Sequence, residues 1–132
     1  MAVEPPSVLL VEAQEDTRKM LEPLFEEWGY SATLVGTATE GLRNSLERRF
    51  DIIILDDWLP DLDGVELCRQ IREIDQQTPV IFFSAATMGS EDRRAFAVGA
   101  NAYIYKNGGL GSLREAMHKE LNKNQRHILK PE

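Results

Sequence analysis

Five short apolar runs alternate along the chain with five stretches of helical periodicity. Each run is four or five residues long, and turn-forming or polar residues bound it, which is typical of strands buried on both faces. The second run alternates with polar residues, which is typical of an edge strand. The predicted strands are residues 7–11, 32–35, 51–55, 80–83 and 102–105.

The segments between the runs carry apolar residues at helical spacing. Pro23 lies inside the first predicted helix and should kink it or loosen its first turns. Thr37 and Ser112 begin capping boxes, and Ser90 is a predicted N-cap. Strict alternation of strands and helices predicts an α/β fold, with right-handed crossovers and one parallel sheet covered on both faces.

Composition limits the class of protein. The 132 residues suit one domain, with a core over about 7–122 and a polar tail or linker over 123–132. No apolar run approaches the ~20 residues that span a bilayer. The N-terminus does not resemble a signal peptide, and the single cysteine, Cys68, fits a cytoplasmic protein. A net charge of -7 argues against direct binding of nucleic acid.

Polar residues follow four of the predicted strands: Glu12, Asp56, Ser84 and Lys106. The carboxyl ends of parallel strands gather at one edge of a sheet, where such sheets bind ligands. A carboxylate there can serve as a metal ligand or as a nucleophile toward phosphorus. A hydroxyl and an ammonium beside it could bind phosphoryl oxygens. The pattern therefore predicts a site that handles phosphate.

The chain resembles the receiver domain of two-component response regulators over residues 7 to about 122. The matching stretches are residues 8–12, 51–56, 59–60 with 63–64, 79–85 and 99–106. The resemblance implies a doubly wound, flavodoxin-like fold with five parallel strands in the order 2-1-3-4-5 and five helices. It also implies phosphorylation by a histidine kinase or a phosphotransfer protein, with an unidentified output partner or effector domain.

The resemblance also implies the role of each site residue. Asp56 would be the phosphoacceptor, with Lys106 pairing to the phosphoryl group. Ser84 would be the switch hydroxyl and Tyr103 the switch aromatic, which turns inward after phosphorylation. A magnesium ion would be bound by Glu12, Asp56 and the backbone carbonyl of Trp58.

Two departures from the family pattern fall at the site. Ala13 stands where the family has a second acid, so we expect weak magnesium binding. Asn107 follows Lys106 where the family usually has proline, so we expect a trans peptide bond. Strand alternation should point Asp57 away from Asp56. Asp57 and two further acids, Asp61 and Asp63, are therefore expected to be solvated loop residues.

Several functions remain open. One is a phosphorylatable receiver. Another is a pseudo-receiver, an interaction module in which Ala13 has impaired magnesium-dependent phosphorylation. An enzyme such as an aspartyl-phosphate phosphatase would need an acid two residues after Asp56, where the chain has Trp58. A flavin site would need a phosphate-binding loop after the first strand. We therefore expect a signalling domain rather than an enzyme.

Overall fold

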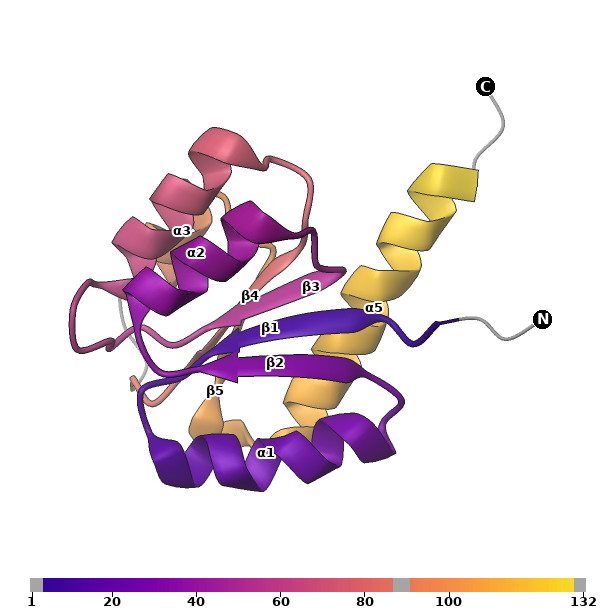
Figure 1. The fold of residues 1–132 in the computed structure, drawn as a ribbon, viewed down its shortest axis with the longest axis horizontal. Coiled ribbons are helices and arrows are strands. Elements are labelled where there is room, and N and C mark those ends of the chain that lie inside the picture. Colours follow the sequence, from indigo (N-terminus) through magenta and orange to yellow (C-terminus); the bar gives the residue numbers. More distant parts are fainter. Residues whose placement is uncertain (1–3, 87–90, 130–132) are drawn as a thin grey trace.

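A computed structural model describes residues 4–86 and 91–129, the last six by their backbone alone. The strands are β1 (Ser7–Val11), β2 (Ser31–Val35), β3 (Ile52–Leu55), β4 (Val80–Ser84) and β5 (Ala102–Tyr105). The helices are α1 (Glu15–Glu27), α2 (Ala38–Glu47), α3 (Gly64–Ile74), α4 (Glu91–Ala97) and α5 (Leu110–Leu129), with a 3₁₀ turn at Lys106–Gly108. Figure 1 shows their arrangement.

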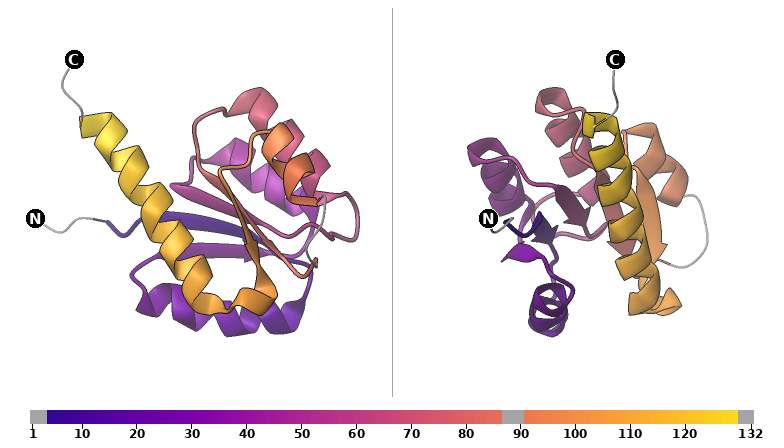
Figure 2. Two further views of the ribbon diagram at one scale, coloured as in Figure 1. Left: turned by 180° about the vertical axis from the view of Figure 1, so that it is seen from behind. Right: turned by 90° about the vertical axis from the view of Figure 1, so that its right-hand side faces the viewer.

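The five strands form one parallel sheet in the order β2-β1-β3-β4-β5. This confirms the predicted α/β fold and its strand order. Helices cover both faces of the sheet, as the two views of Figure 2 show. Because β3 lies between β1 and β4, the residues that follow it lie at the middle of the sheet edge.

Strand alternation divides the core in two. One set of side chains packs under α2, α3 and α4, and the other packs against α1 and α5. The first set includes Leu9, Val11, Ile53, Leu55, Val80 and Phe82. The second includes Val8, Leu10, Ile52, Ile54, Ile81 and Phe83. The polar residues that follow each strand continue this alternation, so each side chain points to the face opposite that of the residue before it.

Several local predictions can be compared with the structure. Thr37 caps α2 as predicted, accepting a hydrogen bond from the Glu40 backbone N–H. The prediction of a cap at Ser112 is wrong, because α5 begins at Leu110 and the Ser112 hydroxyl donates to the Gly108 carbonyl instead. Helix α1 continues through Pro23. The predicted cap at Ser90 lies outside the described residues.

Helix α5 is longer than expected. The sequence predicts a polar tail or linker after residue 122, but the helix continues to Leu129, and its last turns project past the sheet in Figure 1. The Lys106–Asn107 peptide bond is trans, as predicted. No helix within residues 4–86 and 91–129 combines the length and the hydropathy that crossing a bilayer requires.

Gly64 explains why the loop after β3 can fold tightly against the site. A Cβ atom at this position would lie 2.1 Å from the backbone carbonyl oxygen of Asp56. The Gly64 N–H also donates to the Asp57 carbonyl at 2.9 Å. Only a residue without a side chain allows this approach, so Gly64 fixes the backbone from which Asp56 and Asp57 project.

Candidate functional site

Three of the predicted residues meet on the α1 and α5 side of the sheet edge. They are Glu12 after β1, Asp56 after β3 and Lys106 after β5. We call these two acids and their lysine the acidic group. The Lys106 ammonium lies 2.7 Å from Glu12 Oε1 and 3.6 Å from Asp56 Oδ2. Asp56 Oδ1 accepts a hydrogen bond from the Trp58 backbone N–H at 3.3 Å. One cation therefore faces two carboxyl groups.

The electrostatics of this group raise the proton affinity of Asp56. Glu12 is 1% exposed and Asp56 is 5% exposed. Burial raises the pKa of Asp56 to about 6, with a further contribution from the negative charge of Glu12 and an opposing one from Lys106. A single ammonium thus compensates only part of the cost of two buried carboxyl groups.

The remaining residues meet on the opposite face, under α4. There, the Asp57 carboxylate accepts hydrogen bonds from two side-chain hydroxyls, those of Ser84 and Tyr103. The Ser84 hydroxyl donates to Asp57 Oδ2 at 2.6 Å, and the Tyr103 hydroxyl donates to the same oxygen. Strand alternation explains the separation, because Ser84 continues the face of Phe82 whereas Asp56 continues the face of Ile54.

The expectation that Asp57 is a solvated loop acid is wrong. Asp57 does point away from Asp56, as alternation predicts, but this direction leads to Ser84 and Tyr103 rather than to solvent. Its Oδ1 atom is also enclosed and has no hydrogen-bond partner among the described residues. Asp57 is therefore a structural member of the site that the sequence interpretation overlooked.

Tyr103 already points inward in this structure. Its ring stacks on Phe82, with 5.7 Å between ring centroids and 13° between ring planes. Burial and the hydrogen bond to Asp57 raise the pKa of the Tyr103 phenol above its ordinary value. The phenol is therefore protonated at neutral pH and can donate the hydrogen bond that Asp57 accepts.

Two of the predicted magnesium ligands, Glu12 and Asp56, are ion-paired with Lys106 in this structure. Glu12 Oε2 accepts the Gln14 backbone N–H at 2.9 Å, whereas Oε1 is buried and ion-paired with Lys106 at 2.7 Å without a hydrogen bond. Ala13 supplies no side-chain oxygen. Across the part of the chain that the structure describes, no three His, Cys, Asp or Glu side chains are grouped so as to hold a metal ion.

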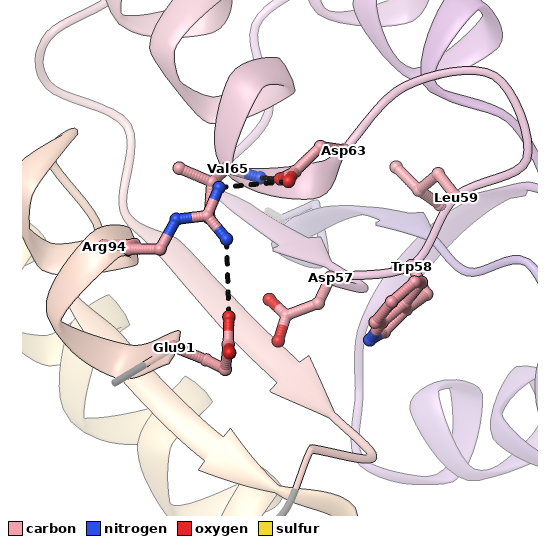
Figure 3. Close-up of a pocket in the computed structure, with 7 residues that line it drawn as sticks. All are labelled: Asp57, Trp58, Leu59, Asp63, Val65, Glu91 and Arg94. Carbon is pink, nitrogen blue, oxygen red and sulfur yellow. Dashed lines mark hydrogen bonds and ion pairs between the residues drawn. The ribbon is translucent and has the colours of Figure 1, made fainter. Parts of the chain in front are cut away.

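A cavity of about 400 Å³ opens beside Asp57, between the loop after β3 and α4 (Figure 3). Trp58 stands at its edge with 77% of its surface exposed. On the other side, Arg94 forms ion pairs with Asp63 at 3.1 Å and with Glu91 at 3.4 Å. The lining residues are Asp57, Trp58, Leu59, Asp63, Val65, Glu91 and Arg94.

The other two loop acids are exposed, as expected, but they also have structural partners. Asp61 accepts the backbone N–H groups of Ala38 and Thr39 at 2.8 and 2.9 Å, and the Thr39 hydroxyl at 2.6 Å. These bonds, the hydroxyl first, lower the pKa of Asp61 to about 2. Asp63 caps α3 by accepting the Val65 N–H at 2.7 Å. Both acids therefore fix the loop that follows β3.

Comparison with known proteins is consistent with this geometry. A family model described as the response regulator receiver domain matches residues 8–118. The uncharacterized transcriptional regulatory protein YkoG of Bacillus subtilis is 36% identical over 99 residues, which are 75% of this chain and 43% of that protein. The sensor histidine kinase AruS of Pseudomonas aeruginosa is 35% identical over 114 residues, covering 83% of this chain and 11% of the kinase.

Solved structures show the same fold. The receiver domain of the sensor histidine kinase PA1611 from Pseudomonas aeruginosa, which has a magnesium ion in its active-site cleft, is 26% identical with a TM-score of 0.82. The match covers 89% of this chain and 98% of that one. A CheY-like receiver protein from Methanospirillum hungatei has a TM-score of 0.88 at 23% identity, covering 93% and 98%. The chain spans less than half the length of YkoG.

Proposed function

Because this chain belongs to the response regulator receiver family, we propose that Asp56 is its phosphoacceptor and that a histidine kinase or a phosphotransfer protein is the donor. The observation that carries the proposal is the position of Asp56. Its carboxylate lies at the carboxyl end of the central strand, 3.6 Å from the Lys106 ammonium. Such an edge is where open parallel sheets bind their ligands.

Asp56 and Lys106 each have a role in this reaction. A carboxylate oxygen of Asp56 attacks phosphorus, and the bond from phosphorus to the donor's imidazole nitrogen breaks as the new oxygen–phosphorus bond forms. The imidazole retains the electron pair of the broken bond. Lys106 is placed to pair with the negative charge of the incoming phosphoryl group, as it now pairs with Glu12 and Asp56.

Magnesium would supply further positive charge if it bound. The contacts of Glu12 with Lys106 and Gln14 support only weak binding, and Ala13 removes one direct ligand. The proposed roles of Asp56 and Lys106 therefore depend on the geometry of the chain's own side chains. The cognate donor would approach at the edge where the exposed Trp58 lies beside Asp56.

The test is intact-mass measurement after incubation with phosphoramidate, at several magnesium concentrations. Wild type should gain one phosphoryl mass. Asp56→Asn should gain none, because its side chain lacks the nucleophilic oxygen. Glu47→Gln is the matched control, since it removes a carboxylate on the exposed surface of α2. A full phosphoryl gain in Asp56→Asn would show that the assignment is wrong.

A second candidate function is an interaction module that is not phosphorylated. The observation that favours it is the combination of Ala13 with a Glu12 that is hydrogen-bonded to the Gln14 N–H through Oε2 and ion-paired with Lys106 through Oε1. This function predicts no mass gain at any magnesium concentration, from phosphoramidate or from a phosphorylated histidine phosphotransfer domain. A folded wild-type protein that never gains mass would favour the module.

A further inference from the structure

Asp57 is a half-buried acid with no role in the proposed phosphoryl transfer. One of its oxygens, Oδ2, accepts hydrogen bonds from the hydroxyls of both Ser84 and Tyr103. The other, Oδ1, is shielded from solvent and lacks a hydrogen-bond partner within the described chain. Hydrogen bonds to an ionised acceptor are stronger than those between neutral groups. Asp57 is therefore the centre of this group of side chains.

The Ser84 hydroxyl is fully engaged by these contacts. The hydroxyl donates its one hydrogen bond to Asp57, and its oxygen accepts a hydrogen bond from the Ala86 backbone N–H at 3.0 Å. A serine hydroxyl has only one proton to donate. Ser84 therefore cannot donate to a phosphoryl group on Asp56 while it donates to Asp57.

The Tyr103 ring is held by the same carboxylate. Its hydroxyl donates to Asp57, and its half-buried ring stacks on the buried Phe82. Both contacts are made by the chain's own residues. An anion built into the chain thus holds the tyrosine in its inward position.

We propose that Asp57 is a positioning residue that holds Ser84 and Tyr103 inward before phosphorylation, and that it competes with a phosphoryl group on Asp56 for the Ser84 hydroxyl. The competition rests on the proposed function, whereas the hold on Tyr103 does not. Asp57 consequently reduces both the change at Tyr103 that phosphorylation can produce and the stability of the phosphorylated form.

The first test measures the hold on Tyr103 without any phosphodonor. Asp57→Leu removes both acceptor oxygens, and the adjacent cavity, lined by Leu59 and Val65, can accept the apolar side chain. Asp57→Asn keeps the shape and one neutral acceptor. NMR of protein with labelled aromatic rings reports contacts between the Tyr103 and Phe82 rings.

Wild type should show strong ring contacts, Asp57→Asn weaker ones and Asp57→Leu the weakest. The ratio of inward to outward Tyr103 should fall about tenfold in Asp57→Leu, as expected for loss of a hydrogen bond to a charged group. Glu47→Gln, which removes an exposed carboxylate, should match wild type. Unchanged ring contacts in the folded Asn and Leu variants would overturn the hold.

The second test measures the competition with a phosphoryl mimic. Beryllium trifluoride is titrated into each variant with excess magnesium, and bound fluoride is followed by fluorine NMR. The dissociation constant should fall about tenfold in Asp57→Leu and less in Asp57→Asn. An equal or higher constant in Asp57→Leu would refute the competition. Absence of binding in every variant would overturn the competition and the proposed function together, while the ring contacts still decide the hold.

Discussion

Replacement of Asp56 by asparagine should stabilise the protein at alkaline pH. The pKa of Asp56 is raised to about 6 by burial and by Glu12, against an ordinary value of 3.8. A rise of this size corresponds to ~3 kcal/mol of unfolding free energy. The native state holds the Asp56 proton between pH 4 and 6, where the unfolded chain has lost it. Wild-type stability therefore falls as pH rises through this window, and the full cost is present above pH 6.

The amide of the Asp56→Asn variant has no proton to lose, so the variant avoids this fall. The difference between variant and wild type should be about 2 kcal/mol larger at pH 8 than at pH 4.5, where part of the fall has already occurred. Urea denaturation followed by circular dichroism, with chelator present, measures both values. Glu47→Gln should show no such change because its carboxylate is exposed. An equal gain at both pH values, or a loss at pH 8, would refute the reasoning.

Three further predictions concern the loops around the site. Gly64→Ala should lower the free energy of unfolding, measured by urea denaturation, by about 1–3 kcal/mol because its Cβ would meet the Asp56 carbonyl. Gly111→Ala, with open space around it, should be neutral or stabilising, and equal effects of the two variants would contradict this. Asp61→Ala should cost about 1 kcal/mol at pH 7 through loss of its bonds to the start of α2, and less as pH falls below 4 towards its lowered pKa of about 2; an unchanged urea midpoint would argue against the cap. Ala13→Asp should tighten magnesium binding by about tenfold or more in calorimetric titration, and equally tight binding by wild type would point to another ligand.

The fold could be predicted from the sequence because the strand signal is strong. Runs such as residues 52–55 are apolar at every position and only four residues long, which fits a strand covered on both faces better than a helix. The helix ends were harder to predict. The Ser112 motif has the spacing of a capping box, but α5 begins earlier at Leu110, after the 3₁₀ turn at Lys106–Gly108. Capping motifs specify local hydrogen bonds, and the chain path from β5 determined which residue began the helix.

The position of the acidic group could be predicted from the sequence, but the hydrogen bonding of Ser84 and Tyr103 to Asp57 could not. Glu12, Asp56 and Lys106 each follow a strand, so their convergence follows from a parallel sheet. Ser84 was expected to join them at Asp56, but its hydroxyl bonds Asp57 instead. The signal was present, since alternation from Leu55 assigns Asp57 to the face of Phe82, where Ser84 and Tyr103 also lie. Alternation gives a direction but not the partner found there.

The two consecutive acids connect the two halves of the site. Asp56 and Asp57 extend from one strand to opposite faces, and Gly64 fixes the backbone of both. A phosphoryl group on Asp56 adds negative charge next to Asp57, and like charges in a poorly solvated site repel. Because the Ser84 hydroxyl already has Asp57 as its acceptor, the phosphoryl group must compete for it. Asp57 should therefore control how much phosphorylation of Asp56 changes the position of Tyr103, although Asp57 does not take part in phosphoryl transfer.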